Sequence, residues 1–414
     1  MNDQAIIRRR TCLGLALGIA ADAALPRASD AAGFIDETGP GGTYKTICSF
    51  DRHLGKTPSG VMCASDGLVY GVTAEGGAQG RGTLYCVDTR RRIHVLHTFA
   101  GSPDDGRLAS APPTEGDDGA LYGLVTQGGP VDRGVAYRLG RDGRWDILHT
   151  FGETLEEGYW SWGSLLLASD GQFYGTTSTG GLYGGGVVFR MGKDGTVTPL
   201  WQLGEGHGPA DPVSSLIEGA DGRLYGASAG GGSGYSGAIF TLAKDGSDPR
   251  VLHSFGSAGG SYPGAIVQGQ DGYLYGTTLY GGPKEGGVAY RMATDGSAYV
   301  PLHVFGGRMD GSYPSSPLLE IEPGVFLGTT DRDSASLFDG ALFALTADGR
   351  FQSMRRFGRR SPHGVPDGKA PRGPLCRLPS GELVGTCTSG GAADGGTLWL
   401  AREPEGGWGS GLQT

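Results

Sequence analysis

An Asp-Gly pair recurs at intervals of 50 to 52 residues along this 414-residue chain, and this period is the strongest constraint on its fold. The pairs begin at Asp66, Asp118, Asp170, Asp221 and Asp271, with weaker copies at Pro323-Gly324 and Ser380-Gly381. Glycine accounts for 81 residues, an abundance that without a period would indicate low complexity. The period instead gives most glycines fixed places in seven similar units.

Each unit repeats the same internal pattern. Another glycine follows the first by four residues, and five of these seven glycines come directly after a tyrosine. A Gly-Gly pair comes next in six of the units, followed in each unit by a further glycine and then an aromatic residue: Tyr85, Tyr137, Phe189, Phe240, Tyr290, Phe343 and Trp399. Asp-Gly between apolar runs predicts a tight hairpin in which both central residues have positive φ. Each unit therefore reads as four antiparallel strands, termed a to d from the inside outward, and forms one blade of a β-propeller.

The segment before the first unit matches the strand that the last unit lacks. The seventh unit stops without a fourth strand, whereas Ile47-Cys48-Ser49-Phe50 precedes the first unit and aligns with Leu96-His97-Thr98-Phe99. We predict that this N-terminal strand completes the last blade. The predicted fold is all-β: a single seven-bladed β-propeller of four-stranded antiparallel blades over residues 43–414.

The repeated phrase Asp-Gly-x-Leu-Tyr-Gly-Thr-Thr-x-x-Gly-Gly, with its later Asp-Gly and Leu-His-x-Phe, resembles the GloVer tandem repeat of exported bacterial proteins. The likeness covers nearly the whole chain after residue 43. It implies a propeller and export, and it implies no particular activity. Function must therefore be argued from the loops.

The N-terminus has the order of a secretory signal. Arg8-Arg9-Arg10 precedes an apolar run over residues 12–21 and small residues at 21–23, which favours twin-arginine export. The alternative is a disordered cytosolic tail. We expect residues 1–28 to be a signal peptide, residues 29–42 a linker, and the mature protein to be periplasmic or extracellular. The apolar run is too short to span a membrane. The net charge of −9 argues against nucleic acid as a partner, and we expect a monomer.

Five cysteines follow the expected signal, and all fall in the first unit, the last unit or the closing strand: Cys48, Cys63, Cys86, Cys376 and Cys387. In an oxidising compartment they predict a disulfide at the seam of the ring, with one thiol left over from the odd number. Inert buried thiols are the first alternative. A metal or catalytic role is the second, although no spacing matches a zinc motif.

In a propeller the a-b and c-d turns share one face, and the d-a and b-c loops share the other, which is here the more variable face. His97, His149, His253 and His303 repeat in strand d and are interpreted as structural. His53, His207 and His363 fall in d-a loops and break the pattern.

Two d-a loops carry candidate ligand-binding residues. The last one contains Arg359, Arg360, His363, Lys369 and Arg372, and the guanidinium groups suit a carboxylate, sulfate or phosphate. The alternative is a solubilising loop. The loop after the second blade contains Tyr159, Trp160 and Trp162, which either pack on a neighbour or stack on a sugar.

Two further loop features have less specific interpretations. Tyr262 and Tyr313 recur in Gly-Ser-Tyr-Pro and are interpreted as structural. Asp331, Asp333 and Asp339 replace the Gly-Gly pair of the sixth unit and could bind calcium, although a solvated loop is the alternative. No other cofactor is expected.

Three functions remain open. The first is a binding propeller that holds a carbohydrate-type, possibly acidic, polysaccharide or surface ligand on the variable face. The second is a polysaccharide lyase for a uronic-acid polymer, with His363 or Tyr159 as base, His207 assisting, and Arg359, Arg360 and Arg372 neutralising the substrate carboxylate. The third is a structural or protein-docking ring.

Overall fold

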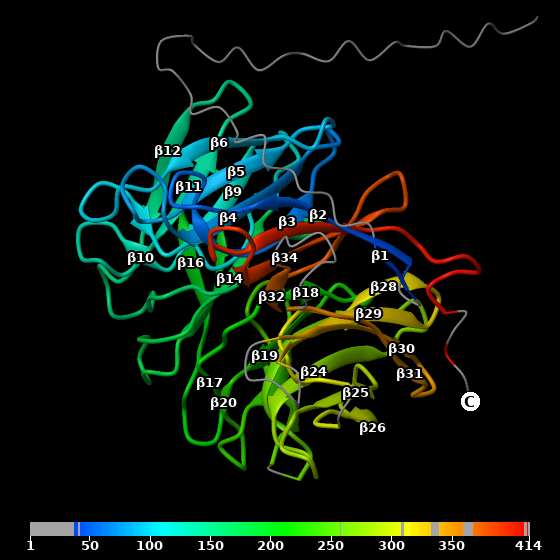
Figure 1. Ribbon diagram of the computed structural model, residues 1–414. Coiled ribbons are helices and arrows are strands. Elements are labelled where there is room, and N and C mark those ends of the chain that lie inside the picture. The colour runs from blue at the N-terminus through cyan, green and yellow to red at the C-terminus, as the bar shows by residue number, and fades with distance from the viewer. Residues whose placement is uncertain are drawn as a thin grey trace, which may run out of the picture.

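The computed structural model describes residues 37–39, 42–256, 258–307, 310–332, 339–358, 367–409 and 412. These residues form seven antiparallel blades around a central axis, which confirms the predicted all-β propeller (Figure 1). Within the described ranges, no helix has the length and apolarity that a bilayer crossing requires. The expected signal peptide and most of the expected linker lie outside these ranges.

The first three blades are regular, and their strands are given from the inner strand a to the outer strand d. Blade 1 consists of β3 (Lys56–Cys63), β4 (Val69–Glu75), β5 (Thr83–Val87) and β6 (Ile93–Thr98). Blade 2 consists of β8 (Thr114–Glu115), β9 (Leu121–Val125), β11 (Val135–Leu139) and β12 (Trp145–Thr150). Blade 3 consists of β13 (Leu166–Leu167), β14 (Phe173–Thr177), β15 (Val187–Met191) and β16 (Val197–Gln202).

In blades 6 and 7, strand a consists of two short strands. Blade 4 consists of β18 (Ile217–Glu218), β19 (Leu224–Ser228), β21 (Ala238–Leu242) and β22 (Arg250–Ser254), and blade 5 of β23 (Ser261–Gln268), β24 (Leu274–Tyr280), β25 (Val288–Met292) and β26 (Val300–Val304). Blade 6 consists of β27 (Ser312–Pro314) with β28 (Leu319–Glu322), β29 (Val325–Arg332), β30 (Ala341–Thr346) and β31 (Phe351–Arg356). Two short loop pairs are β7 (Gly106–Arg107) with β10 (Gln127–Gly128) and β17 (Pro209–Ala210) with β20 (Gly230–Gly231).

The N-terminal strand closes the ring as predicted. Blade 7 consists of β32 (Gly368–Pro371) with β33 (Cys376–Arg377), β34 (Leu383–Gly390), β35 (Thr397–Ala401) and finally β2 (Gly42–Ser49), which is followed outward by β1 (Glu37–Gly39). Tyr44 of β2 lies opposite Ala401 of β35, and Ser49 lies opposite Thr397. In Figure 1 the blue start of the chain accordingly lies beside its red end.

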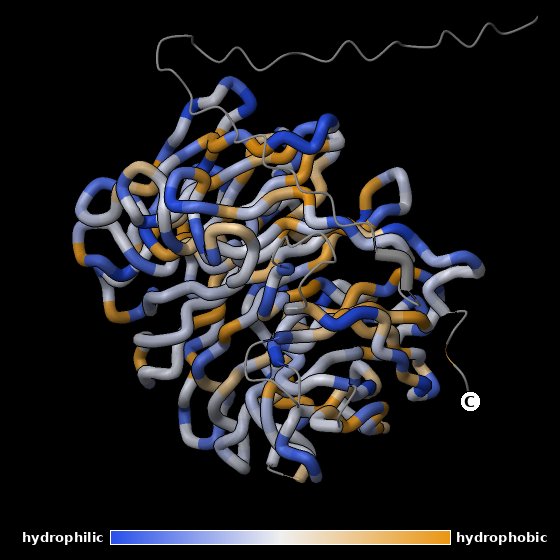
Figure 2. The backbone as a smooth tube through the Cα atoms, viewed as in Figure 1, coloured by the Kyte–Doolittle hydropathy of each residue, from blue (hydrophilic) through white to orange (hydrophobic). Residues whose placement is uncertain are grey.

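The glycine of strand b and the aromatic residue of strand c form one packing device. A Cβ atom at Gly71 would overlap the ring of Tyr85, and a Cβ atom at Gly385 would overlap Trp399. The aromatic ring therefore fills the space that glycine leaves on the neighbouring strand. Apolar residues line the strands (Figure 2) and pack between consecutive blades: Phe99 of blade 1, for example, shares a core cluster with Tyr137 of blade 2.

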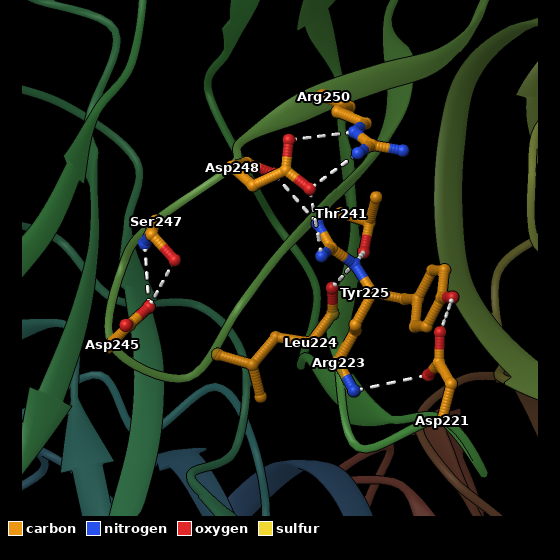
Figure 3. A network of polar contacts seen from close by, with 9 residues as sticks. All are labelled: Asp221, Arg223, Leu224, Tyr225, Thr241, Asp245, Ser247, Asp248 and Arg250. Carbon is orange, nitrogen blue, oxygen red and sulfur yellow. Dashed lines mark hydrogen bonds and ion pairs between the residues drawn. The ribbon is translucent and has the colours of Figure 1, made fainter.

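The Asp-Gly turns differ from the expected type. In blade 4 only Gly222 has positive φ (76°), and Asp221 does not. The amide of Gly222 donates to the carbonyl oxygen of Gly219 at 2.8 Å, so the hairpin loop ends on a left-handed glycine, and a single residue needs positive φ. The Asp221 carboxylate accepts hydrogen bonds from the Arg223 amide (3.1 Å) and the Tyr225 hydroxyl (2.7 Å), as Figure 3 shows. The same Asp–Tyr bond in blades 1 to 5 explains the repeated tyrosine before the strand-b glycine.

Candidate functional site

The d-a and b-c loops meet on one face, here termed the loop face. The Gly129 amide of a b-c loop donates to the carbonyl oxygen of Asp105 in a d-a loop at 3.0 Å, and Gly391 donates to Asp367 in the same way at 3.0 Å. Among the described residues, every exposed large hydrophobic side chain except Val251 and Val300 belongs to this face: Val131, Leu155, Trp160, Trp162, Leu182, Tyr183, Tyr235, Tyr262 and Tyr280. This is the distribution expected of a binding face.

Each blade places one non-glycine residue with positive φ where the chain enters strand a. These seven residues, termed the rim, have φ values between 51° and 63°: Thr57, Leu108, Trp160, Asp211, Tyr262, Tyr313 and Ala370. Six of them follow a d-a loop glycine by two positions, and Asp211 follows Gly208 by three. The left-handed region is sterically costly for residues with a Cβ atom, and such strain persists only where the surroundings fix it.

Backbone hydrogen bonds from the preceding blade fix the rim. The Trp160 amide donates to the carbonyl oxygen of Arg133 at 3.1 Å, and the Asp211 amide donates to that of Gly185 at 2.9 Å. Thr57, Tyr262 and Tyr313 make equivalent bonds at 2.8 to 2.9 Å. Because the backbone alone makes these bonds, the rim side chain can differ from blade to blade.

Two residues beyond each rim position, a second set of side chains occurs where the chain approaches the central axis. These inner positions are Ser59, Ser110, Trp162, Val213, Gly264, Ser315 and Arg372. All except Gly264 line a central cavity of about 1110 Å³. Five of the seven are small, whereas Trp162 and Arg372 are large and chemically distinctive. The structure thus brings two of the residues predicted to bind substrate to one cavity.

Arg372 is positioned by a carboxylate from the neighbouring blade. Its Nε donates to Asp331 Oδ1 at 2.9 Å and its Nη2 donates to Asp331 Oδ2, which raises the pKa of Arg372, with a smaller contribution from the nearby Tyr280. Asp331 is buried, while the Arg372 side chain is half-exposed. Nη1 makes no hydrogen bond to a described residue, so this part of the guanidinium group can donate to a ligand. Trp162 is held by a 3.2 Å bond from its Nε1 to Ser178 Oγ.

Three tyrosines lie in contact with one another on the loop face of blades 5 and 6. The Tyr280 ring lies 5.7 Å from Tyr262 and 5.3 Å from Tyr313, in both cases edge to face. The Arg332 guanidinium carbon lies 5.3 Å from the centre of the Tyr313 ring. Tyr262 and Tyr280 are each 45% exposed. We term Tyr262, Tyr280 and Tyr313 the tyrosine ladder.

Asp211 is a rim carboxylate without a side-chain partner among the described residues. It is partly buried, and this burial raises its pKa above the ordinary value of 3.8. Neither Asp211 nor Tyr280 was singled out from the sequence. Alignment of the d-a loops on the proline that follows the rim residue in five of the seven blades gives the signal that finds Asp211, which precedes Pro212.

The repeated sequence of the chain matches a known family of proteins. The sequence model of the Gloeobacter/Verrucomicrobia repeat matches residues 28–198, 103–266 and 212–408. The chain belongs to this repeat family. The resemblance to the GloVer repeat is thereby confirmed. No curated protein matches the chain.

Solved structures show the same fold at low sequence identity. An oligogalacturonate lyase from Vibrio parahaemolyticus has a TM-score of 0.57 at 13% identity, with 90% of this chain and 97% of that chain covered. A manganese complex of oligogalacturonate lyase has a TM-score of 0.55 at 14% identity, with 90% and 96% covered. The extracellular domain of a putative hybrid two-component system from B. thetaiotaomicron has a TM-score of 0.59 at 11% identity, with 88% and 40% covered. These likenesses establish the propeller fold.

The other predicted ligand-binding and catalytic residues lie apart from the cavity or outside the described ranges. Tyr159 is partly buried with the Arg133 guanidinium carbon 4.6 Å from its ring centre, and His207 is exposed, with its ring 5.4 Å from that of Tyr235. Neither lines the central cavity. Trp160 belongs to the rim, and Lys369 Nζ lies 3.9 Å from Asp339 Oδ1. Arg359, Arg360 and His363 lie outside the described residues.

The expected calcium ligands do not form a cluster in the part of the chain that the structure describes. Asp331 pairs with Arg372, Asp339 lies near Lys369, and Asp333 falls outside the described ranges. Among the described residues, no three metal-ligating side chains come together. The calcium site stays a prediction from the sequence.

The strand-d histidines have the structural role expected of a repeated position. His97 Nε2 lies 2.8 Å from Asp105 Oδ2 while its ring stacks on Trp145 at 3.6 Å. His303 pairs with Asp310 at 3.1 Å and stacks on Phe351 in the same way. These side chains tie strand d to a d-a loop and to the next blade.

One predicted disulfide is present at the seam. Cys63 of blade 1 is bonded to Cys376 of blade 7, with their Cα atoms 5.8 Å apart. The expectation of a single leftover thiol was wrong, because Cys48, Cys86 and Cys387 are all free. Burial raises the pKa of both Cys48 and Cys86 to about 12, so neither is a thiolate nucleophile at neutral pH.

Proposed function

We propose that this protein binds an acidic carbohydrate at the loop-face mouth of its central channel. The observation that carries the proposal is the presence of Trp162 and Arg372 in one cavity whose other inner positions are small. An indole ring offers an apolar surface for a sugar ring, and a guanidinium group forks onto a carboxylate. Two oligogalacturonate lyases share the fold, which supports a carbohydrate-related role.

Binding of oligogalacturonate to the purified protein tests this proposal. In Arg372→Lys the charge is kept and the fork is lost, so we expect affinity to fall about 10-fold or more. Trp162→Ala should weaken binding similarly. Arg144→Gln is the matched control, because Arg144 is an exposed cation on the opposite face, paired with Asp146. Calorimetric titration should show wild-type affinity for this control. Equal affinity of Arg372→Lys and wild type would contradict the proposal.

A second candidate is a lyase for uronic-acid polymers. The Tyr280 ring packs on Tyr313, which lies two residues from Ser315 of the cavity that Arg372 also lines, and a phenol and a guanidinium group near one cavity favour this candidate. A base removes the proton α to the carboxylate, a carbon–carbon double bond forms, and the glycosidic C–O bond breaks as the leaving oxygen gains a proton. Arg372 would neutralise the carboxylate, and Tyr280 would exchange protons. Arg359, Arg360 and His363, together with Tyr159 and His207, remain candidates from the sequence.

Absorbance of the unsaturated uronate product separates the two candidates. A lyase produces this absorbance with oligogalacturonate or another uronate polymer, and Tyr280→Phe should abolish it while binding persists. Binding without new absorbance from any uronate polymer would leave the binding function and remove the lyase. We place either activity after export, in the periplasm or outside the cell, and the seam disulfide is consistent with an oxidising compartment.

A further inference from the structure

The tyrosine ladder lies beside the channel mouth and has an amphipathic surface. Its three side chains come from two adjacent blades, since Tyr262 and Tyr280 belong to blade 5 and Tyr313 to blade 6. Aromatic side chains at a protein surface usually pack against other residues and so lose contact with water. Tyr262 and Tyr280 instead remain 45% exposed. The ladder is therefore available to a ligand.

The backbone holds the ladder in place before any ligand binds. Tyr262 and Tyr313 are rim residues with φ of 58° and 62°. Their amides donate to the carbonyl oxygens of Ser236 and Gly286 at 2.9 and 2.8 Å. Tyr280 ends β24 and packs its ring between the other two. Such preorganisation lowers the entropy that a ligand must lose on binding.

Two cations lie close to the Tyr313 end of the ladder. Arg332 lies over the Tyr313 ring and makes no ion pair with a described residue. Arg372 pairs with Asp331, the residue that precedes Arg332. Asp331 occupies only Nε and Nη2 of Arg372, so Nη1 can still donate a hydrogen bond to a ligand carboxylate. The surface thus offers stacking rings together with two guanidinium groups.

We propose that the tyrosine ladder is a second sugar subsite, which binds a linear oligosaccharide with more than one carboxylate. This inference rests on the proposed function. One uronate unit lies at the channel mouth with its carboxylate at Arg372. Adjacent units follow the ladder toward Arg332, which receives a second carboxylate. An oligomer presents one carboxylate to each guanidinium group, so the site favours oligomers over monomers.

Titration of the full protein with galacturonate and with oligogalacturonates of increasing length tests the subsite. Wild type should bind longer oligomers more tightly, and the gain should shrink with methyl-esterified oligomers, which lack the charge. Tyr280→Ala should lower the affinity for the longer oligomers by about 2- to 10-fold more than the affinity for the monomer. Tyr280→Phe should retain the gain. Arg332→Gln should lower oligomer affinity most at low salt.

Tyr235→Ala is the matched control, because Tyr235 is an exposed tyrosine on the same face whose recorded ring contact is with His207. Unchanged oligomer affinity in this variant supports the assignment to the ladder. Affinity that does not depend on length, or a full length gain in Tyr280→Ala, overturns the subsite while leaving the proposed function intact. No binding of any galacturonate by wild type overturns both.

Discussion

Single carboxylates in the d-a loops have opposite effects on folding. Burial opposes ionisation of Asp105, but hydrogen bonds from His97, the Ala100 amide and the Gly106 amide hold its pKa below the ordinary value of 3.8. Burial without such partners raises the pKa of Asp211. The charged Asp105 carboxylate therefore stabilises the folded ring, whereas the charged Asp211 carboxylate destabilises it.

Asp105→Ala should lower the free energy of unfolding by about 1–3 kcal/mol at neutral pH, because three donors lose their acceptor. A lowered folded-state pKa gives stability that is present above pH 3.8 and lost as pH falls through the folded value. The difference from wild type should thus disappear in acid. Asp104→Ala, at an exposed neighbour, is the control and should change stability by less than about 0.5 kcal/mol. Denaturant titrations across pH measure both.

Asp211→Asn should change stability in the other direction. The raised pKa means that the folded state disfavours the carboxylate increasingly as pH rises above 3.8. Asparagine keeps the shape and tolerates positive φ, so we expect stabilisation by about 0.5–1 kcal/mol at neutral pH. No difference is expected well below pH 3.8. Thermal denaturation at neutral and acid pH provides the measurement, and a less stable variant at pH 7 would show that Asp211 has a stabilising partner.

The candidate site was only partly predictable from residue types. A group of aromatic residues in one d-a loop predicts Trp162 as a binding residue and a group of cations in another predicts Arg372, and both line the cavity. Tyr262 and Tyr313 were interpreted as structural because Gly-Ser-Tyr-Pro recurs, but the recurrence marks a left-handed rim backbone that leaves Tyr262 exposed. Tyr280 has no local signal, since its role depends on rings from two blades.

The closing strand β2 places a large aromatic side chain in the core of the last blade. Tyr44 is 2% exposed, and the Arg355 guanidinium carbon lies 3.5 Å from its ring centre. The rings of Phe357 and Trp399 lie within 5.6 Å. We therefore expect Tyr44→Ala to destabilise the protein by about 3–5 kcal/mol. Tyr183→Ala, at a half-exposed loop tyrosine, should have little effect on the same unfolding curve, and equal effects would show that β2 does not hold the ring.

The seam disulfide closes the ring a second time. Cys63 and Cys376 are separated by 313 residues, so their bond closes a long loop and thereby lowers the entropy of the unfolded chain. Replacing both with alanine should cost about 2–5 kcal/mol of stability. A reducing agent should destabilise wild type to the level of this variant and leave the variant itself unchanged. Insensitivity of wild type to reduction, with the disulfide shown to be broken, would contradict this role.

The architecture was predictable because each blade repeats a local device. A strand-b glycine accepts a strand-c ring in blade after blade, so the period alone gives the strand order and the number of blades. The turn type was not predictable in the same way. Asp-Gly suits two loop lengths, and the hydrogen bonds around Gly219 and Gly222 decide between them.

The two faces of the whole ring have divided roles. On the turn face, charged side chains join neighbouring blades: Glu115 of blade 2 accepts hydrogen bonds from Ser65 of blade 1 and from Arg141. Glu218 of blade 4 does the same for Ser169 and Lys244. The turn face is therefore occupied by contacts that hold the ring together, whereas the loop face presents the exposed aromatic residues.

A bound ligand should protect backbone amides from hydrogen exchange on the loop face and leave those of the turn face unaffected. With saturating oligogalacturonate, we expect hydrogen exchange to slow in the loops that carry Trp162, Arg372 and the tyrosine ladder, because the ligand covers them and their backbone bonds open less often. The amides of the a-b and c-d turns should exchange as in the free protein. Galacturonate monomer should protect the channel mouth and leave the ladder loops unchanged, since one sugar cannot reach both. Protection confined to the turn face would place the binding site on the other side of the ring.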